Sequence, residues 1–267
     1  MKRVQAGRWT MRDISWLTTR PIAHRGYHDA AKGCIENSPS AITAAMEKSF
    51  SIEVDLQQSA DDVPIVFHDD TLDRLTFETG PVRARTADEL SRVMMRGTDD
   101  RLWRLDDLLD LVGDRVGLCI EIKSRFGRAP ERAFIKSIAD SLARHDGPVA
   151  VKSFDPEMMA LMREAAPDIP RGALGDGARD MKEWGRASRV ERFALRHMLH
   201  SLRTRPSFVS YWVKDLPALA PSVHRRLFGL PIIAWTVRTP EDLARARAFA
   251  DQIVFEGFDP DAATASR

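Results

Sequence analysis

Short strand-like runs of apolar residues recur along this chain, and segments with helical spacing separate them. The nine strand-like runs cover residues 21–24, 51–56, 65–68, 116–123, 149–154, 171–174, 208–213, 232–237 and 253–256. In the helical segments apolar side chains recur about every four residues, as Phe134, Ile138 and Leu142 do within residues 131–144. Strand followed by helix, repeated along one chain, predicts a parallel β/α architecture.

The length of the chain fits one large domain or two small ones, and a single barrel is the natural candidate. Its 267 residues, 43% of them apolar, can bury a large core, and a single (β/α)8 TIM barrel takes about 250 residues. We therefore expect one α/β barrel domain over residues 20–260, preceded by a basic arm over 1–19 and followed by a tail over 261–267. Trp9 and Trp16 of the arm are expected to fold over the bottom of the barrel. Because eight strands close such a barrel, one of the nine runs is an accessory strand, which the pattern does not single out.

Charge and cysteine content bear on the kinds of binding partner and on the cellular compartment that we expect for this protein. With 40 basic and 39 acidic residues and a formal net charge of +1, the chain has no global field that favours nucleic acid or an anionic membrane, so any basic feature is local. No segment is long and apolar enough to span a bilayer, and the N-terminus lacks the apolar stretch of a secretory signal. Only Cys34 and Cys119 are present, the second inside a strand-like run, which predicts no disulfides and a reducing, cytoplasmic setting.

Carboxylates interrupt two of the strand-like runs, where a parallel sheet ordinarily has continuous apolar residues. Strand alternation puts Glu53 and Asp55 on one face of the first run, and Glu121 and Lys123 on one face of the second. Three carboxylates around one cation lose their mutual repulsion, and oxygen ligands favour Mg²⁺ or Ca²⁺ over zinc. The pattern predicts a divalent-cation site. The alternative is a network of ion pairs with Lys123 and Arg25 that needs no metal.

Two histidines each follow a short apolar strand. His24 comes after residues 21–23 and His68 after residues 65–67, and catalytic groups of a parallel barrel lie at the carboxyl ends of its strands. An imidazole titrates near neutral pH, so one histidine can remove a proton while another supplies one. We therefore predict His24 and His68 as an acid/base pair. Two core histidines bonded to the backbone would leave the neighbouring acids unexplained.

Several short motifs stand in a fixed order across residues 21–260. They are His24-Arg25-Gly26, Glu36-Asn37-Ser38, Glu53-x-Asp55, the run from His68 to Thr76, Glu121-Ile122-Lys123 and Trp235-Thr236-Val237. In this order and spacing they resemble the glycerophosphodiester phosphodiesterases. The resemblance implies a TIM barrel that uses a divalent cation to split glycerophosphodiesters into glycerol 3-phosphate and an alcohol. It also implies that the neighbouring glycerol hydroxyl attacks phosphorus before water opens a cyclic phosphate.

The resemblance assigns roles to individual positions. The expected site comprises the catalytic histidines His24 and His68, the metal ligands Glu53, Asp55 and Glu121, and the substrate contacts Arg25, Lys123 and Trp235. The expected partner is a small-molecule glycerophosphodiester, which would place the chain in lipid and glycerol metabolism. Two alternatives remain open: a lysophospholipase D-like phosphodiesterase of the same superfamily, and a catalytically silent barrel that binds a partner.

Two segments depart from the resemblance. Asp61-Asp62 stands where an Asp-Gly turn is usual, which asks Asp62 for a conformation that glycine takes more easily. Phe255-Glu256 stands where many members carry Thr-Asp, which changes the floor or rim of the expected pocket.

Three further segments have open or structural interpretations. Glu36-Asn37 fits equally a helix entry and a part of the site, and the glycines of residues 172–177 indicate a flexible turn rather than a phosphate loop. The arginine-rich segment 179–205 is typical of a solvated helix face. It could instead overhang the site and hold an anionic or lipid-like substrate, a hypothesis that charge reversal without loss of substrate affinity would remove.

Overall fold

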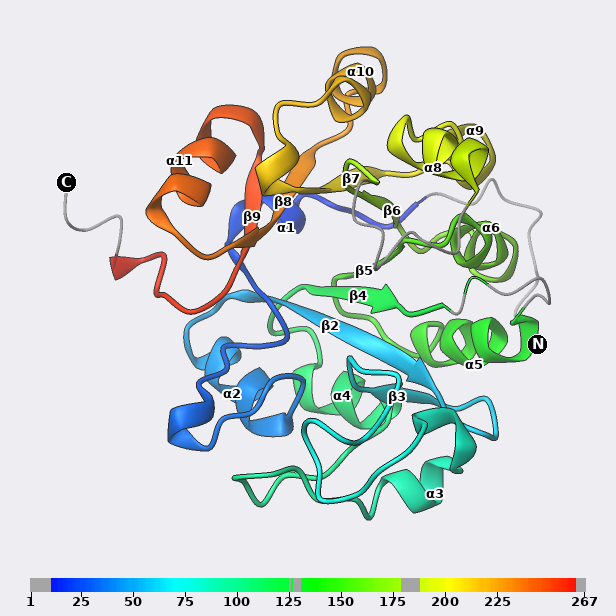
Figure 1. Cartoon of the computed structure of the whole chain (residues 1–267), viewed down its shortest axis with the longest axis vertical. Helices are drawn as coiled ribbons and strands as arrows, with labels where there is room; N and C mark the ends of the chain where they lie inside the picture. The colour runs from blue at the N-terminus through cyan, green and yellow to red at the C-terminus, as the bar shows by residue number, and fades with distance from the viewer. Residues whose placement is uncertain (1–10, 125, 127–130, 179–187, 263–267) are drawn as a thin grey trace.

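Eight parallel strands close into a barrel in the computed structural model of the chain, which describes residues 11–124, 126, 131–178 and 188–262 (Figure 1). Strand β1 pairs with both β2 and β9, and this pairing completes the ring. The predicted (β/α)8 TIM barrel is therefore confirmed. The barrel strands are β1 (Ile22–Ala23), β2 (Ser51–Gln58), β4 (Leu118–Ile122), β5 (Val149–Ser153), β6 (Arg171–Gly175), β7 (Phe208–Trp212), β8 (Ile232–Val237) and β9 (Gln252–Phe255).

The accessory strand is β3 (Pro64–Val66), which pairs antiparallel with β2. The expectation that His68 closes a barrel strand was wrong, because the turn before β3 reverses the chain and sends it back along β2. Asp62 in this turn has a φ of +60°, the left-handed conformation expected for it. The amide of Phe67 then donates to the carbonyl of Asp55 at 3.0 Å. This pairing returns His68 to the barrel mouth by a route that strand alternation does not predict.

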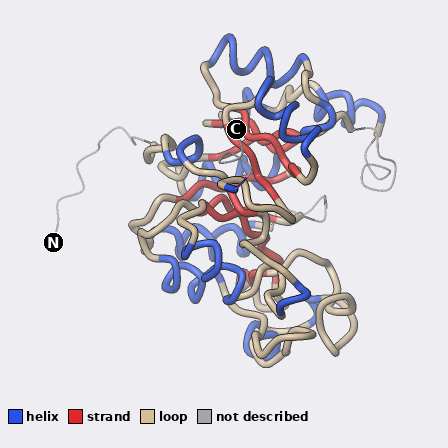
Figure 2. The backbone as a smooth tube through the Cα atoms, turned by 90° about the vertical axis from the view of Figure 1, so that its left-hand side faces the viewer, coloured by secondary structure: helices blue, strands red, loops and turns tan. Residues whose placement is uncertain are grey.

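Helices surround the strands, as Figure 2 shows from the side. Ser38 caps α2 by accepting a hydrogen bond from the amide of Ala41, and Pro39 follows it at the first helical position. The α-helices are α1 (Trp16–Thr19), α2 (Pro39–Glu47), α3 (Ala87–Leu90), α4 (Leu105–Val112), α5 (Arg132–Leu142), α6 (Pro156–Ala165), α8 (Arg189–Arg196), α9 (Ser201–Thr204), α10 (Leu219–Phe228) and α11 (Pro240–Phe249), and short 3₁₀ turns are η1 (Ala30–Lys32), η2 (Val82–Ala84) and η3 (Val213–Asp215).

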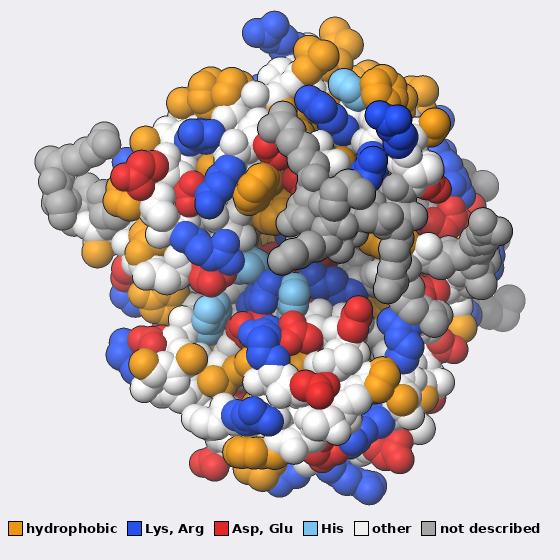
Figure 3. All heavy atoms as spheres, in the orientation of Figure 1, with side chains coloured by type: hydrophobic (Ala, Val, Ile, Leu, Met, Phe, Trp, Pro, Cys, Tyr) orange, Lys and Arg blue, Asp and Glu red, His pale blue; other side chains and the backbone are white. Residues whose placement is uncertain are grey.

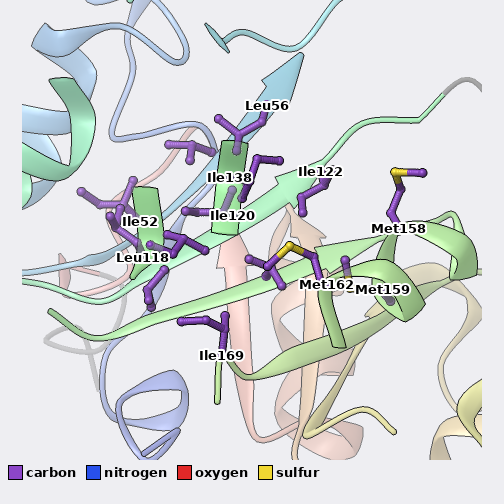
Figure 4. Close-up of a cluster of buried hydrophobic side chains, with 14 of the residues drawn as sticks. Ile52, Leu56, Leu118, Ile120, Ile122, Ile138, Met158, Met159, Met162 and Ile169 are labelled. Atoms are coloured by element: carbon purple, nitrogen blue, oxygen red, sulfur yellow. The ribbon is translucent and has the colours of Figure 1, made fainter. Parts of the chain in front are cut away.

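The main core lies between the outer faces of the strands and the helices. Figure 4 shows Ile52 and Leu56 of β2 in the same apolar layer as Ile120 of β4, with Ile138 of α5 and Met162 of α6. These strand residues alternate with the carboxylates, so burying the apolar face against helices turns Glu53, Asp55 and Glu121 toward the barrel interior. Packing of the core therefore orients the site.

A second apolar cluster fills the barrel interior at the amino ends of the strands. It contains Leu17, Ile22, Cys119, Ala150, Phe208, Ile233 and Val254. The ring of Trp16 packs so closely on Gly117 that a Cβ there would collide with it. Residues of α1 thus cover the bottom of the barrel, as expected for Trp16, whereas Trp9 lies outside the described residues. The domain boundaries at residues 20 and 260 stay predictions.

The glycine-rich run after residue 171 is not the flexible turn that we expected. Gly172 and Gly175 are buried within β6. The ring of Phe208 from β7 occupies the space where a side chain at Gly172 would stand. Phe208 therefore leaves room only for glycine at position 172. The sequence around residue 172 gives no sign of this contact, because Phe208 comes from another strand.

A half-buried histidine near the barrel makes stability depend on pH. His200 lies at the start of α9, and burial first, with His224 adding to it, lowers the pKa of His200 to about 4. The unfolded chain, with a pKa of about 6.5 for this group, binds more protons between these two values. Stability should therefore fall as the pH falls from about 6.5 to 4, and His200 should account for up to about 3 kcal/mol of that loss.

Urea unfolding of the wild type and His200→Gln at pH 7 and pH 4 measures this contribution. The glutamine variant should lose less free energy of unfolding between the two pH values. Equal losses in the two proteins would show that His200 does not remain neutral in the folded state.

Candidate active site

A cavity of about 380 Å³ opens where the barrel strands end. Figure 3 shows histidine side chains around a hollow in the middle of the visible face, with acidic and basic side chains beside them. Of the predicted site residues, His24, Arg25, Asp55, His68, Glu121, Lys123 and Trp235 line the cavity. Glu53 is the eighth predicted residue, and it is buried next to this lining.

Three carboxylates converge beneath the cavity. Glu53 and Asp55 come from β2 and Glu121 from β4, where Asp55 and Glu121 are partners in the strand register. One oxygen from each lies within 4.8 Å of the others, and all three side chains are buried. The structure thus brings together the three acids that were predicted to hold a cation.

Two lysines contact these carboxylates, the partly exposed Lys123 and the buried Lys152. Lys123 Nζ lies 2.8 Å from Asp55 Oδ1 and 2.5 Å from Glu121 Oε1. Lys152 Nζ, on β5, lies 2.8 Å from Glu53 Oε1 and 3.6 Å from Glu121 Oε2. Burial alone would lower the pKa of each lysine, but the carboxylates outweigh it and raise both values, so both ammonium groups stay charged.

The contacts with basic residues also change the pKa values of the acids. Burial would raise the pKa of Asp55, but Lys123, His68 and Arg25 together hold it well below its ordinary value. The pKa of Glu121 is lowered against burial by Lys123 and Lys152. Both carboxylates are therefore ionised at neutral pH and available as ligands.

Lys152 was missed in the sequence analysis, although a signal was present. It stands in an otherwise apolar strand, and alternation with Val149 and Val151 points it into the barrel. A lysine on that face requires a buried anion as partner. The rule that singled out Glu53 and Asp55 would have found it.

Two details bear on whether a cation fits among the acids. Glu53 Oε1 is buried, and within the described residues its close polar contact is Lys152 Nζ at 2.8 Å. Three ionisable carboxylates form the hard oxygen donor set that Mg²⁺ and Ca²⁺ prefer. The donor set therefore fits such a cation.

His24 is held by a carboxylate from the last barrel strand. Its Nδ1 lies 2.5 Å from Glu256 Oε2, and the same oxygen accepts a hydrogen bond of 2.7 Å from Arg238 Nη2. Burial would raise the pKa of Glu256, but His24 and Arg238 lower it, so Glu256 stays ionised and accepts the Nδ1 proton. The other nitrogen, Nε2, lies 3.9 Å from Glu53 Oε2 and is left for chemistry.

His68 is oriented in the same way by its neighbour in sequence. Its Nδ1 lies 2.7 Å from Asp69 Oδ1, and Arg74 binds both oxygens of Asp69 at 2.6 and 2.8 Å. Arg74 also reaches Glu36, which pairs with Arg25 at 2.6 Å. A continuous chain of charged groups thus links the two sides of the cavity.

Glu36 and Asn37 fit both interpretations left open for them, because they directly precede the capped start of α2 and their side chains contact Arg25 and Asp55. Asn37 Nδ2 donates to Asp55 Oδ2 at 3.0 Å, and Asn37 Oδ1 accepts from the amide of Asp55 at 3.2 Å. Trp103 Nε1 donates to the carbonyl of Asn37 at 2.8 Å. The segment before α2 therefore fixes the orientation of one of the three acids.

Comparison with known proteins agrees with this geometry. Residues 24–259 match the glycerophosphoryl diester phosphodiesterase family. The chain belongs to this family of phosphoric diester hydrolases. It is 28% identical over 256 residues to a glycerophosphodiester phosphodiesterase of Caldanaerobacter subterraneus, a match that covers 92% of this chain and 96% of that protein.

Two solved structures share the fold. A phosphodiesterase of Oleispira antarctica in complex with the product sn-glycerol-3-phosphate aligns with a TM-score of 0.72 at 18% identity, over 90% of this chain and 94% of that one. A glycerophosphodiester phosphodiesterase of Thermotoga maritima aligns with a TM-score of 0.65 at 24% identity, over 88% and 92% of the two chains.

Aromatic side chains form one wall of the cavity in this family member. Trp235 and Phe154 pack edge to face with centroids 5.5 Å apart, and Trp212 lies in the same lining. The indole nitrogen of Trp235 is buried and has no hydrogen-bond partner among the described residues. Trp235 thus packs in the core and also faces the cavity.

The arginine-rich segment does not reach this wall within the part of the chain that the structure describes. None of residues 188–205 lines the cavity, and residues 179–187 lie outside the described ranges. For residues 188–205 the interpretation as an overhanging substrate clamp has no support.

Proposed function

We propose that this chain is a metal-dependent glycerophosphodiester phosphodiesterase, which hydrolyses glycerophosphodiesters to glycerol 3-phosphate and an alcohol. The observation that carries the proposal is that two histidines, each held at Nδ1 by a carboxylate, line the same cavity as three converging acids. Membership of the family supports the diester as substrate class. The relative with sn-glycerol-3-phosphate as its product supports the same class of product.

His24 and His68 are proposed to move the protons. A carboxylate accepts the Nδ1 proton of each ring, which leaves each Nε2 free to take or to give a proton. One imidazole removes the proton of the glycerol hydroxyl next to the phosphate, and the hydroxyl oxygen forms a bond to phosphorus. The bond from phosphorus to the alcohol breaks, and the second imidazole protonates the departing oxygen. Water then opens the cyclic phosphate, with the two rings in exchanged roles.

Arg25 and Lys123 are proposed to face the phosphate. Both line the cavity, and the pKa of Arg25 is raised against its burial by Asp55, Glu36 and Glu53. A charged guanidinium and an ammonium stabilise the negative charge that gathers on the phosphate oxygens in the transition state. Trp235 would contact the glycerol or the alcohol group.

Glu53, Asp55 and Glu121 are proposed to hold Mg²⁺ or Ca²⁺. When bound, the cation supplies Lewis-acid stabilisation of the phosphate and its neighbouring oxygen. Lys123 contacts two of the same carboxylates, so a bound cation would share them with Lys123. The remaining support is chemical, namely a donor set made only of carboxylate oxygens within 4.8 Å of one another.

The attack by a neighbouring hydroxyl can be tested with the substrate alone. A phosphocholine diester of 1,3-propanediol lacks the hydroxyl next to the phosphorylated carbon of glycerophosphocholine. The proposal expects no hydrolysis of this analogue and transient cyclic phosphate from glycerophosphocholine, both followed by ³¹P NMR. Hydrolysis of the two diesters at similar rates would contradict the mechanism.

Glu256 is expected to act on the reaction through His24. Glu256→Ala removes the acceptor of the Nδ1 proton and should lower kcat by about ten- to hundredfold with little change in KM. Glu256→Gln keeps a hydrogen-bond acceptor and should recover part of this loss. Steady-state kinetics with glycerophosphocholine, with exposed Glu241→Ala as the control, measures both. A loss confined to KM, or none, would assign Glu256 a role outside His24 orientation.

We also propose that residues 20–260 form the catalytic unit and that the protein works in a reducing, cytoplasmic setting. Cys34 and Cys119 are both free thiols. Burial raises the pKa of Cys119 to about 12, so this thiol is inert at neutral pH. Within the described residues no helix has the length and apolar character needed to cross a bilayer.

A further inference from the structure

Helices α8, α9 and α10 expose apolar side chains where a surface helix ordinarily has polar ones. Seven of the twelve large apolar side chains that are exposed in the described residues fall within residues 190–228. They include Leu202, which is 86% exposed, and Leu219 and Leu227, which are 70% and 71% exposed. Leu219 and Leu227 are eight residues apart on α10, so they lie on one face of that helix.

These helices form one continuous part of the molecule. His224 Nε2 on α10 lies 2.8 Å from Ser201 Oγ on α9, and the rings of His224 and Phe228 are 5.8 Å apart. Figure 1 places α8 beside α9, with α10 next to them at the top of the view. We refer to the exposed residues of α8, α9 and α10, with the turn that joins α8 to α9, as the α8–α10 surface.

The α8–α10 surface is also strongly basic. Residues 189–204 and 219–228, which make up these helices and the turn, contain six basic residues and one acidic residue, a formal charge of +5, whereas the whole chain carries +1 and the rest therefore −4. On α8, Phe193 lies within one turn of both Arg189 and Arg196. Arg189 and Arg196 form no salt bridge with any described residue, and the same holds for Arg205 and Arg226.

Exposed apolar side chains beside arginines that form no salt bridge with any described residue match the chemistry of one partner. We propose that the α8–α10 surface binds the surface of an anionic phospholipid bilayer. Phe193, Leu202 and Leu227 would enter the headgroup region while the arginines contact lipid phosphates. Nucleic acid would use the arginines but leave the apolar side chains in water. A second copy of this chain would bring two surfaces of +5 together, which charge repulsion opposes.

The α8–α10 surface lies at the edge of the face on which the cavity opens. In Figure 3, apolar and basic side chains gather along the upper right edge of the face that carries the hollow, where α8 and α9 lie. A protein bound to a bilayer through this edge would hold the cavity mouth close to the lipid headgroups. The proposal itself concerns binding and does not depend on the activity proposed above.

Sedimentation with vesicles tests the proposal in the full chain. Wild type should bind vesicles of phosphatidylglycerol and phosphatidylcholine, bind pure phosphatidylcholine at least about tenfold more weakly, and be released by salt. The double variant Phe193→Ser/Leu202→Ser and the double variant Arg189→Glu/Arg196→Glu should each lower partitioning at least about tenfold. Both variants should keep the melting temperature of the wild type, which shows that they are folded.

Matched substitutions elsewhere provide the controls. Phe77→Ser removes an aromatic side chain that is 73% exposed outside the α8–α10 surface, and Arg247→Glu reverses an exposed charge on α11. Neither should change partitioning. Failure of the wild type to sediment with anionic vesicles would overturn the proposal, as would equal losses in the control variants. So would a dimer in sedimentation velocity that Leu202→Ser dissociates without affecting vesicle binding.

Discussion

Replacing either His24 or His68 by alanine is expected to lower kcat for glycerophosphodiester hydrolysis by about 10²–10⁴-fold. Both rings line the cavity, and each is held at Nδ1 by a carboxylate. Because one imidazole is proposed to accept a proton and the other to donate one, loss of either would block a proton transfer that the remaining ring cannot supply. Substrate binding should change far less, since Arg25 and Lys123 remain.

Initial rates with glycerophosphocholine over a range of concentrations separate kcat from KM in these variants. His197→Ala is a suitable control, because that ring packs on Phe193 at 4.4 Å and does not line the cavity. Two histidine variants that keep wild-type kcat would remove both rings from the chemistry.

The second large effect is expected for the acid cluster. Glu53→Gln removes one of three proposed ligands and should lower kcat/KM by about 10³-fold, the scale of a lost Lewis acid. Mg²⁺ or Ca²⁺ should raise the melting temperature of the wild type, because a ligand of the folded state stabilises it. The same ions should leave the melting temperature of the variant unchanged. Exposed Glu47→Gln is the matched control and should respond to the cation as wild type does.

The competing account of these acids is a network of ion pairs without a metal. The charges allow it, since Arg25, Lys123 and Lys152 contact or approach Glu53, Asp55 and Glu121. In that case Glu53→Gln would leave Lys152 with a weaker partner and lower the melting temperature, while no cation would shift the wild type. Thermal unfolding with and without Mg²⁺, Ca²⁺ and chelator therefore distinguishes the two accounts without any activity assay.

The barrel could be predicted from sequence because apolar and inward-facing residues alternate along its strands in the same way. Every second residue of β2 and β4 is apolar and packs on helices, which leaves Glu53, Asp55 and Glu121 on the inner face. Alternation carries no information on strand direction, however. It therefore identified the run at β3 but not its antiparallel pairing, which is what brings His68 to the cavity.

Residues that act through distant partners were harder to predict. His24 and Glu256 are 232 positions apart and meet only because β9 closes the ring beside β1. The departure at Glu256 was visible in the sequence, but its partner was not. Lys152 meets Glu53 from β5, across β4. Such contacts follow from the register of the whole barrel and from no single segment.

The measurement that tests the central claim most directly is release of glycerol 3-phosphate from glycerophosphocholine by the purified chain. It should be run with Mg²⁺, with Ca²⁺ and with a chelator, alongside His24→Ala and Glu53→Ala. The account predicts release that requires a divalent cation and is lost in both variants. Release that persists in chelator or in either variant would contradict it, as would a folded wild type that releases no product with either cation.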